Sequence, residues 1–153
     1  MNNTEIRSRQ SAELVARPDN LRILMTEKSH QKKYKEIKEG IAEFMKDKGF
    51  NVCLRDDDLC IVSRVKNTPN VGDEEDKFPD VEGSYSGRIF QRGLAKLEDD
   101  IDSKHSITQY KLFAGKGDLV IGIPKGCREK LEKVLDENLN QDERKAIKEI
   151  LEF

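Results

Sequence analysis

The chain has 153 residues, and its 28 basic and 30 acidic side chains give a formal net charge of −2. This length is typical of a single domain with one core. Because the charge balance creates no overall basic field, we expect neither nucleic acid nor a membrane as a partner. The N-terminal residues lack the apolar core of a signal peptide, and no apolar run is long enough to span a bilayer. We therefore expect a cytoplasmic protein.

Cysteine and histidine residues are sparse, with three cysteines and two histidines in the chain. No CxxC pair occurs, and His30 and His105 lie far apart in the sequence. We therefore expect no structural zinc site, no other metal and no cofactor. Cys53 and Cys60 are expected to face each other across a hairpin, as free thiols in the cytosol or as a disulfide in an oxidising compartment.

The first half of the chain predicts a helix followed by a hairpin. Residues 1–20 carry few large apolar groups, so we expect a weak helix or mobile tail ahead of a single domain over 21–153. Apolar residues recur at three- and four-residue steps over 29–48, which predicts a helix. The sequence FNVCLRDDDLCIVSRV, at about 50–65, predicts a hairpin in which Leu54 faces Leu59 and Val52 faces Ile61.

The second half predicts a loop, a helix, a hairpin and two final helices. Residues 66–87 are rich in acidic groups, glycine and proline and predict a long loop. Helical spacing returns over 88–102, and residues 105–123 alternate like two strands joined by a turn at Gly115–Gly117. Helices are expected over 127–138 and 140–152. Together these elements predict an α+β domain in which two hairpins form one antiparallel sheet packed against helices.

The glycine-rich stretch FAGKGDLVIGIPKGC raises the question of a phosphate-binding loop. Lys116 is followed by a predicted strand rather than a helix, so we interpret AGKGD as a turn. A second candidate lies at the strand-to-helix junction 124–128, where backbone N–H groups and two cations could bind an anion. Cys127 would lie in the first helical turn, but a structural role is favoured over catalysis because the histidines are remote. The candidate ligand-binding residues are Lys125, Gly126, Cys127 and Arg128, with Tyr85 and Arg88 from the loop.

No catalytic pair, triad, metal cluster or nucleotide motif emerges from these residues, so the sequence gives more weight to binding than to enzymatic activity. We expect a protein-binding module of the chaperone, immunity, antitoxin or effector kind, because a long acidic loop and sheet edges suit a protein partner. A homodimer is compatible with the same features. The alternative is a protein or enzyme that binds a small anionic ligand, such as a phosphate or nucleotide, at the junction 124–128.

Overall fold

The computed structural model describes the backbone of residues 18–65 and 73–153, with side chains from residue 27 onward within those ranges. Of the tail expected over 1–20, only the last three residues are described, and they begin helix α2 (Pro18–Asp47). The chain forms two compact units that meet at Lys33 and Tyr34. The described part of the first unit is the first half of α2. Within the described ranges, no helix combines the length and apolar character needed to cross a membrane.

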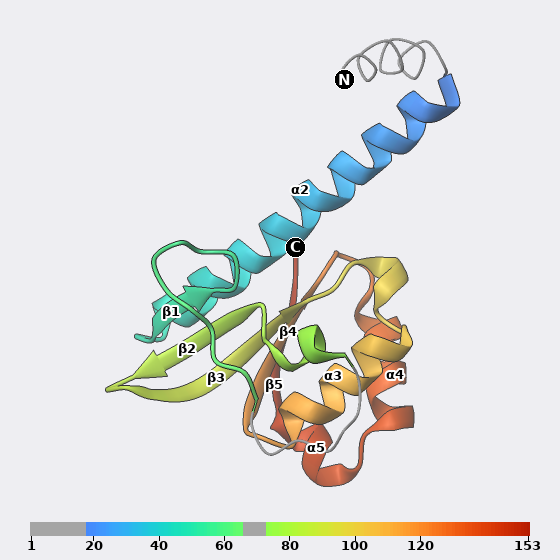
Figure 1. The fold of residues 1–153 in the computed structure, drawn as a ribbon. Coiled ribbons are helices and arrows are strands. Elements are labelled where there is room, and N and C mark those ends of the chain that lie inside the picture. The colour runs from blue at the N-terminus through green and yellow to red at the C-terminus, as the bar shows by residue number, and fades with distance from the viewer. Residues whose placement is uncertain (1–17, 66–72) are drawn as a thin grey trace. The chain divides into compact units, whose positions relative to one another are not determined.

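The second unit is built on a mixed sheet of five strands in the order β1-β2-β3-β4-β5 (Figure 1). Strands β1, β2 and β3 are antiparallel neighbours, whereas β3, β4 and β5 run parallel to one another. The sheet is therefore mixed, and the predicted sheet of two antiparallel hairpins is wrong. The strands are β1 (Asn51–Leu54), β2 (Val81–Tyr85), β3 (Arg88–Ala95), β4 (Asp118–Ile123) and β5 (Ile147–Glu152).

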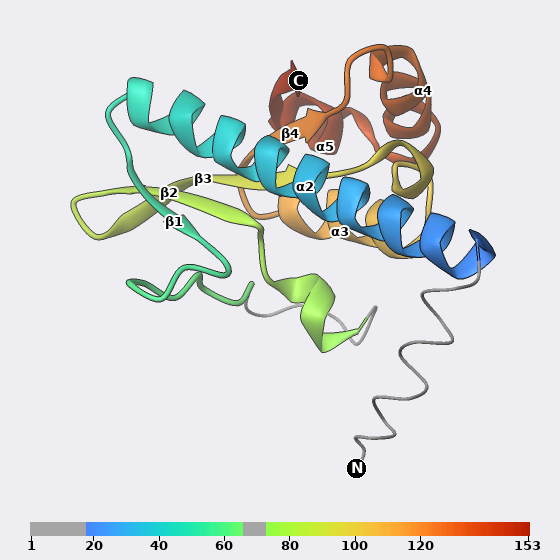
Figure 2. The same cartoon turned by 90° about the horizontal axis from the view of Figure 1, so that it is seen from above.

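Helices cover both faces of this sheet (Figure 2). The part of α2 after Tyr34 packs Ile37, Ile41 and Met45 against one face. Helices α3 (Lys104–Ala114) and α4 (Arg128–Asn138) pack on the other face, where the larger core cluster lies. The short helix α5 (Gln141–Ala146) leads from α4 into β5, and the 3-10 turns η2 (Glu74–Lys77) and η3 (Glu98–Asp100) flank β2 and α3. The two core clusters are separated by the sheet.

Three of the predicted elements have the wrong secondary structure. The predicted helix over 88–102 is strand β3 followed by η3, and the predicted strand from His105 to Ala114 is helix α3. Part of the predicted final helix is β5. The second half of β3 is buried on both faces of the sheet, so this strand lacks the alternating pattern of a half-exposed strand. Ile147 and Ile150 have the three-residue spacing of a helix, but both are buried residues of strand β5.

The first predicted hairpin is also wrong, although Cys53 and Cys60 do lie close together. Strand β1 pairs with β2, so that Cys53 lies opposite Glu82 rather than Cys60. The chain after β1 forms an irregular loop over 55–65, and β2 lies inside the expected acidic loop of 66–87, of which 66–72 are outside the described residues. A disulfide nevertheless joins Cys53 to Cys60.

Candidate functional site

The strand directions bring buried charged residues together at one edge of the sheet. Asp80 directly precedes β2, and Lys96 directly follows β3. Because β2 and β3 are antiparallel, with Val81 opposite Gly93, the start of β2 lies beside the end of β3. The C-terminal ends of the parallel strands β3, β4 and β5 lie together at one end of the sheet, and we call this end the carboxyl edge. Sheets with parallel strands commonly bind ligands at this edge.

Asp80 is fixed by hydrogen bonds to two other elements. Its carboxylate accepts a 2.8 Å bond from the backbone N–H of Ala95 and a 2.5 Å bond from the Tyr34 hydroxyl on α2. Only 7% of the residue is exposed. Burial raises the pKa of this carboxyl, while the bond from Tyr34 and the nearby Lys96 act in the opposite direction. Burial also raises the pKa of the Tyr34 phenol, with a further contribution from the charge of Asp80.

Lys96 is the cation of this edge, and it is 3% exposed. Its Nζ donates a hydrogen bond to the Oε1 atom of Gln109 and lies 3.8 Å from the Oδ2 atom of Asp100. Burial lowers the pKa of the ammonium group, although the carboxylates of Asp100, Asp80 and Asp76 favour its charged form. Asp80 and Lys96 therefore form an electrostatically coupled pair whose pKa values are both shifted by burial.

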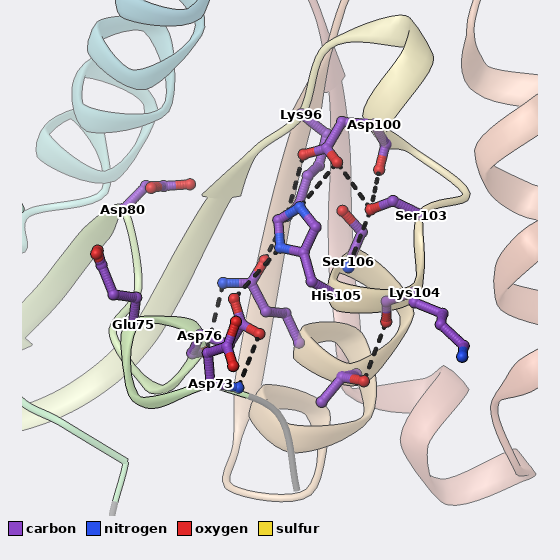
Figure 3. A network of polar contacts seen from close by, with 12 residues as sticks. Asp73, Glu75, Asp76, Asp80, Lys96, Asp100, Ser103, Lys104, His105 and Ser106 are labelled. Carbon is purple, nitrogen blue, oxygen red and sulfur yellow. Dashed lines mark hydrogen bonds and ion pairs between the residues drawn. The ribbon is translucent and has the colours of Figure 1, made fainter.

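A network of polar side chains connects Lys96 to solvent, whereas Asp80 lies apart from this network (Figure 3). His105, at the start of α3, lies between two carboxylates: its Nε2 is 2.8 Å from Asp100 Oδ1 and its Nδ1 is 3.3 Å from Asp76 Oδ1. The Ser103 hydroxyl donates to the same Asp100 oxygen at 2.7 Å. His105 is exposed and Asp100 is half-buried, so the network runs from a buried interior to the surface.

Carboxylates outnumber cations in this cluster. Asp76, Asp80 and Asp100 all act on Lys96, and Lys38 is a second cation that acts on Asp80. A cluster with excess negative charge favours a cation and disfavours a free anion. Among residues 27–65 and 73–153, no group of three or more histidine, cysteine, aspartate or glutamate side chains has the arrangement of a metal site. A cation here would need ligands beyond protein side chains.

The predicted anion site at 124–128 also lies at the carboxyl edge, but the protein's own carboxylate occupies its donors. The backbone N–H of Gly126 donates to Glu152 Oε1 at 3.1 Å, and Arg128 Nε donates to Glu152 Oε2 at 3.2 Å. These two bonds lower the pKa of Glu152. Lys125 is exposed, and its backbone N–H donates to Phe153. Cys127 is 5% exposed, and burial raises its pKa.

Tyr85 and Arg88 lie at the opposite edge of the sheet from the junction 124–128. They pair with each other beside the turn between β2 and β3, where β3 begins. The junction instead follows the end of β4, which runs parallel to β3. The structure therefore brings Lys125, Gly126, Cys127 and Arg128 together but does not bring Tyr85 and Arg88 to them.

Asp80 and Lys96 were not among the functional residues predicted from the sequence, although the residues around each of them are informative. Lys96 is a single cation between Leu94, Ala95 and Leu97, and Asp80 follows Pro79 directly before an apolar residue. No protein-family model, curated protein or solved structure matches this chain. The geometry of the described residues therefore carries the functional inference.

Proposed function

We propose that the protein is a Mg²⁺-dependent phosphoester hydrolase whose reaction takes place at the carboxyl edge. The observation that carries this proposal is the coupled pair of Asp80 and Lys96, two buried, oppositely charged residues delivered by the ends of neighbouring strands. Charged groups whose pKa values are shifted by burial and by a partner of opposite charge are candidates for functional groups. The half-buried Asp100 and the exposed His105 connect Lys96 to solvent.

A hard divalent cation would bind here through a single protein carboxylate, with waters and substrate oxygens as its other ligands, because the described side chains form no metal cluster. Carboxylate oxygens are the ligands that Mg²⁺ prefers, and this ion is commonly held by one or two carboxylates with waters and substrate phosphate. Asp80 would be the first ligand, and the excess of carboxylates around Lys96 favours the positive charge. When bound, Mg²⁺ supplies charge stabilisation to a phosphate group and lowers the pKa of a bound water.

The protein's own residues would supply binding, orientation and charge. Lys96 would place an ammonium group beside the reacting phosphate, where a buried charge acts more strongly than it does in water. Tyr34 holds the Asp80 carboxylate through its 2.5 Å hydrogen bond, so that it would act as a positioning residue. Gln109 would orient Lys96 in the same way.

The proposal is tested with bis(4-nitrophenyl) phosphate and 4-nitrophenyl phosphate as diester and monoester probes, with Mg²⁺ or Mn²⁺ and with EDTA. We expect metal-dependent release of nitrophenolate that falls by about 100-fold or more in Asp80→Asn and Lys96→Met, the scale seen when a group that stabilises a transition state is removed. The matched controls are Asp118→Asn and Lys116→Met, at the opposite edge of the sheet. The proposal would be contradicted if Asp80→Asn and Lys96→Met kept their hydrolase activity, or if the folded wild type had no hydrolase activity.

A second function, protein binding, is favoured by a separate observation. Leu59 and Ile61, on the loop after β1, are 92% and 89% exposed, the highest values among the exposed large apolar residues of the described chain. Two almost fully exposed aliphatic side chains on one loop are typical of a surface that contacts another protein. We therefore keep the protein-binding module as the alternative, with this loop as its contact surface.

The alternative is tested by affinity capture with quantitative mass spectrometry. We expect a specific partner to be lost from Leu59→Ser/Ile61→Ser and retained by Tyr85→Ser/Phe90→Ser, which alters two other exposed apolar residues. Equal capture by the two double variants would remove this loop as the contact surface. Neither result depends on the hydrolase assay, so the two functions can be separated.

A further inference from the structure

The disulfide between Cys53 and Cys60 joins an ordered strand to an irregular loop. The two residues are seven positions apart, and their Cα atoms are 5.9 Å apart. Cys53 is buried within β1, whereas Cys60 is half-buried in the loop. The bond is therefore more accessible from the side of Cys60.

The surroundings of Cys60 favour attack by a small reagent. Cys60 follows Leu59 and precedes Ile61, both of which are almost fully exposed. It also lines a surface pocket with Arg55, Asp57, Ile61, Val62 and Phe78. The Arg55 guanidinium lies over the Phe78 ring at 5.1 Å from its centroid, so a cation is present at this pocket. A nearby cation stabilises thiolates, which are the reactive species in exchange, whereas Asp57 in the same pocket and Glu75, 3.4 Å from Arg55, act in the opposite direction.

We propose that the Cys53–Cys60 bond is a reversible thiol–disulfide exchange site whose reactant is a low-molecular-weight monothiol of the glutathione class. The thiolate of one monothiol attacks Cys60 Sγ, the protein disulfide breaks, and Cys53 leaves as a thiolate that takes up a proton. A second monothiol thiolate attacks the sulfur of the first monothiol in the mixed disulfide and releases Cys60. The protein disulfide is reduced by two electrons, and two monothiols are oxidised to one disulfide.

The chain between and after the two cysteines contacts the rest of the second unit. Asp56 accepts a 2.9 Å bond from Lys38 on α2, and the backbone N–H of Arg55 donates to the carbonyl of Asp80 at 2.9 Å. Beyond Cys60, the N–H of Ser63 donates to Glu82 at 2.8 Å. The disulfide is the covalent connection that holds this irregular loop against β1. Its reduction removes the connection at Cys60, so that the segment between the bonds of Asp56 and Ser63 gains freedom to move while these bonds and those of the sheet remain.

The experiment incubates the native full chain in glutathione redox buffers, alkylates it, and measures its intact mass. The buried Cys127 is the internal control, because native alkylation should not reach it. We expect no adducts on the oxidised protein and two adducts on the reduced protein, with complete reversal by glutathione disulfide. Hydrogen exchange measured by mass spectrometry should show a loss of protection in residues 55–63 and none in β4.

Two variants distinguish exchange at this bond from general unfolding. Cys53→Ser/Cys60→Ser should show the fast-exchanging loop without reductant and no response to glutathione, whereas Cys127→Ser should respond as the wild type does. The proposal is overturned if the bond resists glutathione until the protein is unfolded, if three adducts appear together, or if reduction leaves exchange in 55–63 unchanged. None of these results depends on either proposed function.

Discussion

Gly122 on β4 allows α2 to pack closely against the sheet beside Asp80 and Lys96. The carbonyl of Gly122 accepts the backbone N–H of Lys96, so this glycine lies next to the end of β3. A Cβ atom at position 122 would lie 2.7 Å from Ile37 Cγ2 and 2.9 Å from two side-chain carbons of Ile41. Both isoleucines are fully buried, so neither can move into solvent. The substitution Gly122→Ala therefore forces α2 away from the sheet.

The size of the effect follows from these contacts. Overpacking a close-packed core by one methyl group costs about 1–3 kcal/mol of unfolding free energy. For a chain of this size, each kcal/mol lowers Tm by about 2–4 °C, so we expect a decrease of about 2–12 °C. Because Tyr34 lies one turn before Ile37, the shift should also lengthen the hydrogen bond from Tyr34 to Asp80.

The assay is thermal and urea unfolding of a double-mutant cycle with Ile37→Ala. Removing Cγ2 of Ile37 abolishes the closest contact, so the double variant should lose less stability than the sum of the two single variants. Gly115→Ala is the control, because Gly115 is exposed and has a φ of −71° that alanine adopts without strain. A Gly122→Ala protein as stable as the wild type, or an additive cycle, would refute the close-packing explanation.

Four further outcomes are expected. Burial raises the pKa of Asp80, so folding favours its protonated form. The free energy of unfolding of the wild type, relative to that of Asp80→Asn, should therefore be greatest at acid pH. It should fall as pH rises above about 3.9, the ordinary carboxyl pKa, as measured by urea unfolding. Burial lowers the pKa of Lys96, so folding favours its neutral form. The free energy of unfolding of the wild type, relative to that of Lys96→Met, should therefore rise as pH approaches about 10.4, the ordinary lysine pKa, as measured by urea unfolding. Tyr34→Phe should cost about 1.5–3 kcal/mol in urea unfolding, because a buried carboxylate loses a donor. Cys127 should resist iodoacetamide in the native protein and react only after denaturation, as shown by peptide mass spectrometry.

Elements with strong local signals were predictable from the sequence. The predicted end of the first long helix is confirmed by α2, where Gly49 follows the last turn with a φ of +93° that favours glycine. The helix predicted over 127–138 is confirmed closely by α4, and Asn140 caps α5 through Glu143 as the capping-box pattern indicates. These features depend on residues within a few positions of each other, so a single segment contains the information.

Elements determined by distant partners were not predictable in the same way. Residues 81–85 carry a glycine and an acidic residue, and they form β2 because β1 and β3 supply hydrogen-bond partners on both sides. Helix α3 contains β-branched and aromatic residues that favour strands, but it covers the sheet as a parallel crossover between β3 and β4. The proximity of Cys53 and Cys60 was predicted from a strand pairing that does not exist, because the loop returns to β1 without forming a strand.

The candidate site was hidden from the sequence for a related reason, since its residues come from separate elements and only the folded chain assembles them. Some of its members have a structural role, because Asp76 accepts the backbone N–H of Asp73 and Ser103 caps α3. Asp80 and Lys96 differ, because an asparagine at position 80 could accept one of the two bonds through Oδ1 and donate to the Tyr34 oxygen through Nδ2, and buried charges contribute little net stability. Stability alone therefore does not account for placing these two charges at the carboxyl edge, which makes them the residues whose substitution tests function most directly.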